Sequence, residues 1–200
     1  MIGVIDYEAG NLASVTNALR SLEASVVVSS DARDLGRCSG IILPGVGAAP
    51  LAMDSLNRHN LAGFIRTLEV PFLGICLGMQ VLYDESSEGN TKCLGIVPGM
   101  VEQFDARAAR VPHMGWNEVV LTSEDAPAQL LDRKAHFYFA HSYYSPIGPA
   151  TSAITECGVS FSAAIRRDNY YGVQFHPEKS GPAGLQVLRN FCGLCESFRQ

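Results

Sequence analysis

The sequence predicts an α/β fold in one domain over residues 1–200, with a mixed, mostly parallel sheet, helices on both faces and an antiparallel-rich second half. Three observations predict this fold. Short apolar runs alternate with helical periodicities in the first half, which is typical of parallel strands covered on both faces. Past residue 94, strand-like runs follow one another, with Gly, Pro and Asn turns between them. A chain of 200 residues also suits a single domain that buries its own core.

The elements of the first half follow in order. Residues 1–7 form a short apolar strand, and 11–23 form a helix because apolar residues recur there at helical spacing, at Leu12, Val15, Leu19 and Leu22. Residues 26–30 are a β-branched strand, Asp31 caps a short helix, and 40–43 return to strand. Residues 71–76 are a fully apolar strand, and a helical stretch follows over 77–83.

The second half reads mostly as strands, at 96–104, 110–121, 135–144, 151–156, 161–167 and 170–175. Residues 126–131 suit a helical turn, and a terminal helix covers about 182–198. We expect the strands of both halves to form one mixed sheet.

Composition and charge exclude several classes of protein. Fifteen Lys+Arg against 20 Asp+Glu give a net charge of −5, which lacks the basic excess of a nucleic-acid-binding protein. The start of the chain has no basic segment typical of a signal peptide. The longest charge-free stretch, 38–53, is short and broken by proline and glycine. We therefore expect no nucleic acid and no membrane among the partners.

Six cysteines are scattered through a chain too large to need disulfides, which favours a reducing compartment, the cytoplasm. The spacing of Cys192 and Cys195 admits a redox or metal-binding interpretation. However, both continue the apolar stripe of Leu185 and Leu188 on the terminal helix, where free Cys behaves as a small hydrophobe. Because no second pair completes a zinc site, we expect no metal and no other cofactor.

Residues 74–78, Gly-Ile-Cys-Leu-Gly, match the pattern of a nucleophile elbow with Cys76 as the nucleophile. An apolar strand precedes the motif and a helical stretch follows it. The tight turn requires glycine on both sides because Cβ atoms would collide there. The amide of Leu77 opens the helix, where free N–H groups stabilise a thiolate or an oxyanion. The alternative is a buried cysteine between two packing glycines.

A nucleophile needs a base, and His176 is the candidate. It ends a strand and precedes Pro177, which holds it extended, so Glu178 two residues on faces the same side. A carboxylate there fixes the tautomer of the ring and stabilises the imidazolium. The alternative is a strand-end histidine with an unrelated glutamate. Among the other histidines, 136 and 141 are five apart in a strand and face opposite sides, and 113 suits a packed or loop residue.

Residues 44–48, Pro-Gly-Val-Gly-Ala, follow a strand whose end lies on the same sheet edge as the elbow. A glycine-rich loop there turns backbone N–H groups toward developing negative charge, so Gly45, Val46 and Gly47 are candidates for an oxyanion hole. The alternative is a plain strand-to-helix turn.

Taken together, these motifs resemble class I (triad-type) glutamine amidotransferases, a family with a flavodoxin-like fold. The matching segments are 44–48, 74–80 (Gly-Ile-Cys-Leu-Gly-Met-Gln) and 174–180 (Gln-Phe-His-Pro-Glu-Lys-Ser). Two more, 111–117 (Val-Pro-His-Met-Gly-Trp-Asn) and 138–144 (Tyr-Phe-Ala-His-Ser-Tyr-Tyr), with 6–7 and 10–12 at the start, resemble the glutaminase subunits of imidazole glycerol phosphate synthases. The family more often carries glycine where this chain has Glu8.

The resemblance implies that Cys76 attacks the side-chain amide of L-glutamine, that His176 and Glu178 complete the triad, and that a thioester is hydrolysed. It also places Gln80 and Glu88 near the glutamine, with Glu88 facing the substrate's ammonium group. From the residues alone, both would be solvated helix residues.

The resemblance further implies that ammonia passes to a (β/α)8-barrel cyclase subunit in a heterodimer of histidine biosynthesis. The cyclase makes imidazole glycerol phosphate and aminoimidazole carboxamide ribotide. Four positions match the family's interface with that subunit, and each has a plainer interpretation: Asn11 (a helix cap), Trp116 (a core aromatic), Tyr138 (a strand aromatic) and Lys179 (a surface lysine).

Two other functions stay open at this point. One is a different triad amidotransferase, or a free-standing cysteine hydrolase on the same fold. The other is a binding module that keeps only the fold, against which Cys76, His176 and Glu178 argue.

Overall fold

The structure is a computed structural model that describes residues 1–8, 11–108, 110–122, 130–131 and 134–198. A nine-stranded sheet forms its centre. The strands, in spatial order, are β2 (Val26–Ser29), β1 (Ile2–Ile5), β3 (Gly40–Leu43), β4 (Phe72–Ile75), β13 (Tyr170–Val173), β12 (Ser160–Arg167), β11 (Thr151–Glu156), β8 (His113–Leu121) and β9 (Lys134–His141).

This central sheet changes character at β13. From β2 to β13 all neighbours pair in parallel, and from β13 to β9 all pair antiparallel. A parallel first half and an antiparallel second half were predicted from the sequence, and this prediction is confirmed. The carboxyl ends of β3, β4 and β13 meet at one edge, where ligands bind in such sheets.

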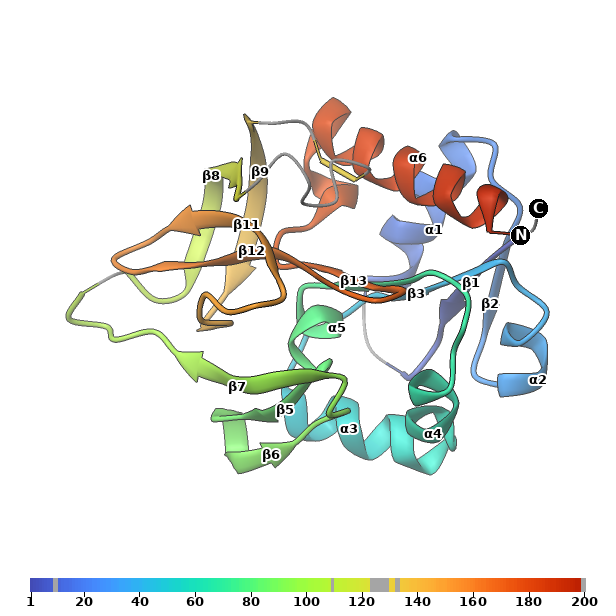
Figure 1. Cartoon of the computed structure of the whole chain (residues 1–200), viewed down its shortest axis with the longest axis horizontal. Helices are drawn as coiled ribbons and strands as arrows, with labels where there is room; N and C mark the ends of the chain where they lie inside the picture. Colours follow the sequence, from blue (N-terminus) through green and yellow to red (C-terminus); the bar gives the residue numbers. More distant parts are fainter. Residues whose placement is uncertain (9–10, 109, 123–129, 132–133, 199–200) are drawn as a thin grey trace.

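Helices cover both faces of the central sheet (Figure 1). On one face lie α1 (Leu12–Ser21) and α6 (Gly181–Ser197), whose apolar sides pack with Ile2 and Val4 of β1. Ile5 of the same strand packs on the other face with α2 (Ala32–Leu35), α3 (Ala49–Arg58) and α4 (Leu61–Arg66). Asp31 accepts a hydrogen bond from the amide of Arg33, so the predicted cap of α2 is confirmed.

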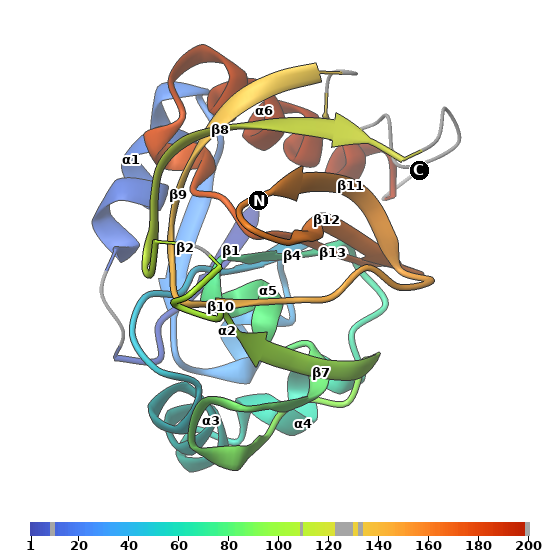
Figure 2. The ribbon, with the colours of Figure 1, turned by 90° about the vertical axis from the view of Figure 1, so that its left-hand side faces the viewer.

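The prediction of one sheet was wrong, because the structure has a second sheet of four strands. Its strands, in spatial order, are β10 (Tyr143–Tyr144), β7 (Val97–Gln103), β5 (Tyr83–Ser86) and β6 (Thr91–Lys92). It lies on the same side of the central sheet as α3 and α4 (Figures 1 and 2). The predicted helix over 77–83 is correspondingly shorter, because α5 spans only Leu77–Gln80 and Tyr83 already belongs to β5.

The remaining boundaries agree to within a few residues. The predicted run 135–144 is divided into β9 and β10, and the strand predicted at 170–175 ends at Val173. Most of the helical turn predicted at 126–131 lies outside the described residues, as does Gly10. Within the described residues, no helix combines the length and apolarity needed to cross a membrane.

The terminal helix agrees with the structural interpretation of its two cysteines. Leu188 and Cys195 of α6 are buried, and Leu185 and Cys192 are half-buried on the same side. Burial raises the pKa of both thiols. They therefore lack the low pKa of a reactive pair.

Candidate active site

The elbow forms where the sequence places it. Cys76 follows β4, precedes α5 and adopts φ 54° and ψ −107°, a conformation that costs a non-glycine residue about 1–3 kcal/mol. A Cβ on Gly74 would collide with the backbone of Gly78, and a Cβ on Gly78 would collide with the carbonyl of Leu43. Both glycines are therefore required sterically, and the turn pushes the Cys76 side chain out at the carboxyl edge of the sheet.

His176 and Glu178 lie together, as their spacing predicts. Nδ1 of His176 is 2.9 Å from Oε1 of Glu178, and both side chains are almost completely buried. His176 is extended, with φ −100° and ψ 96°, but residues 177–179 form a short 3-10 helix (η2, Pro177–Lys179) rather than a continued strand. The backbone of His176 is anchored to β9, because its amide donates to the carbonyl of Tyr138 at 2.9 Å.

The electrostatics favour a charged His176. Burial by itself lowers the pKa of the ring, but hydrogen bonds with Cys76 and Glu178, and the charges of both groups, raise that pKa well above its ordinary value. A proton on His176 is thus stabilised from both sides of the ring. A protonated His176 beside the sulfur is the acid that a leaving group needs after attack by a cysteine nucleophile.

Gln174 is a third contact of the nucleophile. Its Nε2 lies 3.6 Å from Sγ of Cys76, and its side chain is fully buried. Gln174 begins the segment 174–180 that matches the family, but no role was predicted for it. The available signal was a polar residue two positions before His176, and therefore on the same face of the extended segment.

The loop over 44–48 packs directly on the elbow. A Cβ on Gly45 would lie 2.7 Å from the amide nitrogen of Gly78 and 2.7 Å from Cβ of Leu77, so only glycine permits this approach. Gly47 has φ 109°, and no atom lies within 4 Å of the place that its Cβ would take, so it is the conformation that favours glycine there. The structure thus brings Gly45 and Leu77 together beside Cys76.

A cavity of about 220 Å³ opens at Cys76. Its lining includes Val46 and Gly47 from the loop, Leu77 and Gln80 from α5, Glu88 from the 3-10 turn η1 (Glu88–Asn90), and residues 140–143. Of the predicted oxyanion and substrate residues, all but Gly45 therefore line one cavity next to the nucleophile.

Two of these residues differ from what the sequence alone indicates. Gln80 is buried, not solvated, and its Nε2 donates to Tyr143 O at 2.8 Å. Glu88 is half-buried, and its Oε2 accepts a 2.7 Å hydrogen bond from the amide of Ala49 at the start of α3. Their interpretation as solvated helix residues was wrong, because both face the cavity from elements that fold over it.

Of the four predicted interface residues, three are next to the triad and Trp116 is linked to it only through Tyr138. Asn11, at the start of α1, donates from Nδ2 to Oε1 of Glu178 and makes no side-chain cap to its own helix. Lys179 follows the triad glutamate and is exposed. Trp116 and Tyr138 pair across β8 and β9 with ring centroids 6.3 Å apart. The interpretation of Trp116 as a core residue was wrong, since it is 58 % exposed.

The first loop contains the departure from the family pattern. Glu8 has φ 67°, the left-handed region that favours glycine, and its carboxylate pairs with Arg58 at 2.9 Å. Both side chains are largely exposed, so this pair contributes little to stability.

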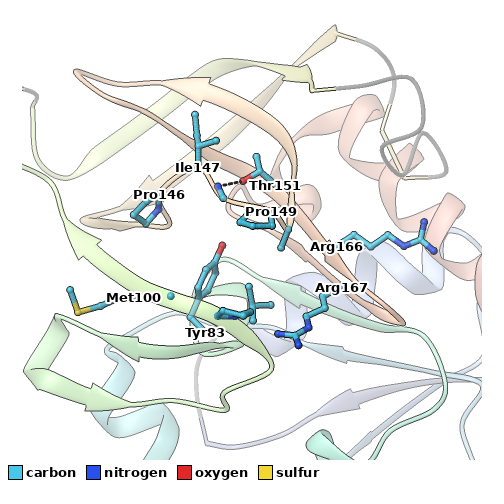
Figure 3. A pocket seen from close by; sticks show the side chains of 13 residues that line it. Tyr83, Met100, Pro146, Ile147, Pro149, Thr151, Arg166 and Arg167 are labelled. Atoms are coloured by element: carbon cyan, nitrogen blue, oxygen red, sulfur yellow. Dashed lines mark hydrogen bonds between the residues drawn. The ribbon is translucent and has the colours of Figure 1, made fainter.

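A second cavity, of about 340 Å³, lies between the two sheets. Tyr83 of β5 points toward the loop with Pro146 and Ile147, and Arg167 lies at the rim (Figure 3). None of its lining residues is a cysteine, a histidine or a carboxylate, so we assign no chemistry to it. The described part of the chain also holds no cluster of three or more metal-ligating side chains.

Comparison with known proteins agrees with this geometry. The profile of the family "Glutamine amidotransferase class-I" matches residues 3–194. The chain is 44 % identical over 195 residues to "Imidazole glycerol phosphate synthase subunit HisH" of Bacteroides fragilis, covering 96 % of this chain and 99 % of that protein. It is 45 % identical over 207 residues to the subunit of the same name from Geobacillus thermodenitrificans, covering 97 % and 96 %.

Solved structures show a similar fold. A putative GMP synthase subunit from Thermoplasma acidophilum superposes with a TM-score of 0.74 at 22 % identity, covering 99 % of this chain and 94 % of the other. A crystal structure of a glutamine amidotransferase has a TM-score of 0.74 at 18 % identity, covering 98 % of both chains.

Proposed function

Because the chain belongs to the class I glutamine amidotransferases, we propose that it is the glutaminase subunit of an imidazole glycerol phosphate synthase. It hydrolyses L-glutamine to glutamate and ammonia and delivers the ammonia to a cyclase subunit in histidine biosynthesis. The observation that carries the proposal is the buried contact of His176 with Glu178 beside Cys76, at the sheet edge where the cavity opens.

The first half of the reaction forms a thioester. The thiolate of Cys76 attacks the side-chain amide carbon of glutamine, the C–S bond forms, and the carbonyl electrons move to oxygen. The amide of Leu77 and a backbone N–H of the 45–47 loop stabilise that oxyanion. As the C–N bond breaks, the imidazolium of His176 gives its proton to the nitrogen, and ammonia leaves.

The second half releases glutamate. Neutral His176, oriented by Glu178, takes a proton from water, and the resulting hydroxide attacks the thioester carbon. The C–S bond then breaks, which returns the thiolate of Cys76 and the imidazolium of His176. The carboxylic acid loses its proton to solvent. One water is consumed, and one glutamate and one ammonia are formed.

The cavity supplies the contacts for glutamine. Glu88 brings a carboxylate to its rim for the ammonium group of the substrate. Gln80 forms part of the wall through its hydrogen bond with the carbonyl of Tyr143. The reaction needs no cofactor, because nucleophile, base and oxyanion donors all come from this chain.

Ammonia would be used by a (β/α)8-barrel cyclase that makes imidazole glycerol phosphate and aminoimidazole carboxamide ribotide. We propose a cytoplasmic heterodimer in which Asn11, Trp116, Tyr138 and Lys179 face the cyclase. The exposure of Trp116 supports an interface there, since a large exposed aromatic is typical of binding surfaces. Residues 1–200 would form one amidotransferase domain.

Glutamate and ammonia release, measured with and without the cyclase and its ligand, tests this function. We expect turnover that depends on the cyclase, and Cys76→Ala should lower it by at least about 10⁴-fold. Cys157→Ala is the matched control, because this half-buried thiol lies away from the cavity.

The same assay separates the alternatives. Full activity of the isolated chain would favour a free-standing hydrolase, and binding of the cyclase without any turnover would favour a binding module. Retained activity in Cys76→Ala would refute the triad.

A further inference from the structure

Two histidines outside the triad form a buried pair, of which His141 lines the cavity at Cys76. His113 of β8 and His141 of β9 lie opposite each other in register, and both are buried. Nδ1 of His113 is 3.0 Å from Nε2 of His141. In this hydrogen bond one ring must donate and the other must accept. The other hydrogen bonds of the two rings determine which ring is the donor.

The second hydrogen bond of His141 shows that this ring is the acceptor. Its Nδ1 lies 2.7 Å from the carbonyl oxygen of Tyr143. A carbonyl only accepts, so Nδ1 of His141 carries the proton. Burial lowers the pKa of this ring to about 3, which keeps the ring neutral. Nε2 is therefore unprotonated and accepts from His113.

The other end gives the same answer independently. Asn117 donates from Nδ2 to the carbonyl of Glu156 at 2.7 Å, and its Oδ1 accepts from the amide of Glu118 at 2.8 Å. These two bonds fix which way the amide faces. The same Nδ2 lies 3.2 Å from Nε2 of His113, so that nitrogen accepts and Nδ1 carries the proton. Both ends thus require donation from Asn117 through His113 to His141.

The series of hydrogen bonds, called the hydrogen-bond chain below, continues from His141 to Cys76. The carbonyl oxygen of Tyr143, which accepts from His141, also accepts from Nε2 of Gln80 at 2.8 Å. Nε2 of Gln80 donates in turn to Oε1 of Gln174 at 3.0 Å. With its oxygen engaged, Gln174 presents its Nε2 to Sγ of Cys76. The amide of Gln174 is therefore oriented to donate to a thiolate.

We propose that His113 and His141 are positioning residues for Cys76. Their hydrogen-bond chain fixes the carbonyl of Tyr143, and that carbonyl holds the two glutamine amides so that an N–H faces the sulfur. The hydrogen-bond chain also keeps residues 140–143 in place at the cavity wall, where the carbonyl of Ala140 lies 4.0 Å from Sγ of Cys76. The expected effect on turnover rests on the proposed glutaminase function. The donor and acceptor roles of His113 and His141 do not depend on that function.

The direction is tested first, without glutamine. In the full chain labelled with ¹⁵N-histidine, long-range ¹H–¹⁵N correlation at pH 7 reports which ring nitrogen carries the proton. We expect His113 and His141 to be neutral and protonated at Nδ1. His136, exposed on the same strand, is the internal reference. A proton on Nε2 of either buried ring would overturn the proposal whether or not the chain hydrolyses glutamine.

The effect on Cys76 is tested with a matched pair of substitutions. His141→Asn keeps an N–H at the position of Nδ1, whereas His141→Leu keeps volume and removes the donor. Alkylation of Cys76 by iodoacetamide is followed across pH by mass spectrometry of its peptide, with kcat/KM for glutamine in the complex as a second readout. We expect His141→Leu to move the alkylation profile to higher pH and lower kcat/KM by about 10- to 100-fold, and His141→Asn to stay within about threefold of the parent chain.

Equal losses in both variants with an unchanged alkylation profile would mean that His141 only fills space, and would refute the positioning role. If His141→Leu does not fold, His113→Asn and His113→Leu repeat the comparison, because Asn again keeps the donor toward His141. If the parent chain lacks glutaminase activity, the proposed function fails, whereas the tautomer and alkylation results still decide whether the chain orients Cys76.

Discussion

His176 and His141 are both buried, at 1 % and 7 % exposure, yet their pKa values move in opposite directions. Burial lowers both. For His176, the Glu178 carboxylate at 2.9 Å and the neighbouring Cys76 outweigh burial and raise the pKa. For His141, the hydrogen-bond partners are the ring of His113 and a carbonyl, so burial prevails; the nearby His176 adds to it, and the pKa falls to about 3.

The two histidines show that burial and the charge of the hydrogen-bond partner act separately on the pKa of a ring. The same side chain carries a proton where a carboxylate faces it, and stays neutral where no carboxylate offsets its burial. Charge complementarity thus decides which buried histidine takes part in chemistry.

The largest test removes the charge that distinguishes the two rings. Glu178→Gln keeps an oxygen for His176 and Asn11 but deletes the carboxylate charge. We expect the pKa of His176 to fall toward that of the other buried histidines and kcat for glutamine to drop by about 100-fold or more. Turnover in the complex and the pH profile of Cys76 alkylation measure both effects.

The new amide group of Glu178→Gln would replace Oε2, which is buried and has no hydrogen-bond partner among the described residues. Stability is therefore measured in parallel, because an unpaired amide there costs about 1–3 kcal/mol. An unchanged pH profile in a folded variant would contradict the role of the carboxylate.

A second test uses pH and the neutral pair. Because the pKa of His141 in the fold lies below its unfolded value of about 6.5, the unfolded chain binds more protons between these values. Stability is therefore lost as pH falls below about 6.5. From pH 7 to 5 we expect His141 to account for about 2 kcal/mol of the decrease in unfolding free energy. The raised pKa of His176 acts oppositely, since its contribution is lost as pH rises above 6.5.

Urea unfolding at both pH values measures this loss in the parent chain, in His141→Asn and in His136→Asn. The asparagine at 141 does not titrate, so its variant should lose less stability on acidification. The exposed control at 136 should behave as the parent chain does. Identical pH dependence in all three would contradict the neutral state of His141.

Features set by local sterics and short sequence spacing could be predicted. The elbow needs glycine at 74 and 78 because a Cβ at either position would collide with backbone a few residues away or on the neighbouring strand β3. Glu178 contacts His176 with only one proline between them in the sequence. The second sheet could not, since β5 is a short segment with charged residues at its centre and carries no apolar pattern. Its edge strand β10 pairs with β7 from far along the chain, Tyr143 opposite Gln103, which no local pattern indicates.

Residues whose partners lie far along the chain were misjudged for the same reason. The contacts of Gln80 come from Tyr143 and Gln174, 63 and 94 positions away, so its helix alone indicates a solvated side chain. Trp116 shows the converse. A tryptophan favours burial by type, but its position on β8 leaves it largely exposed.

A smaller test brings a charge to the neutral pair. Asn117→Asp places a carboxylate 3.2 Å from Nε2 of His113, where the amide nitrogen now lies. We expect the pKa of His113, which burial lowers, to rise by about 1–2 units. NMR titration of the ring measures the shift, with Asn117→Ala as the uncharged control. A protonated His113 still donates from Nδ1 to His141, whereas its Nε2 now donates to the new carboxylate, so only the bond at position 117 reverses. An equal pKa in both variants would contradict the argument from charge.

The smallest effect concerns the second donor to the triad carboxylate. Asn11 has φ 78°, so Asn11→Gly keeps the left-handed backbone and removes only the hydrogen bond to Glu178. His176 still engages the carboxylate, and we expect kcat to fall by only about 3- to 10-fold. Asn60→Gly is the matched control, because Asn60 precedes α4 with φ 57° and makes no cap hydrogen bond. Equal kcat in the two variants would show that His176 alone keeps the carboxylate in place, and the contrast between the two histidines would then rest on a single ion pair.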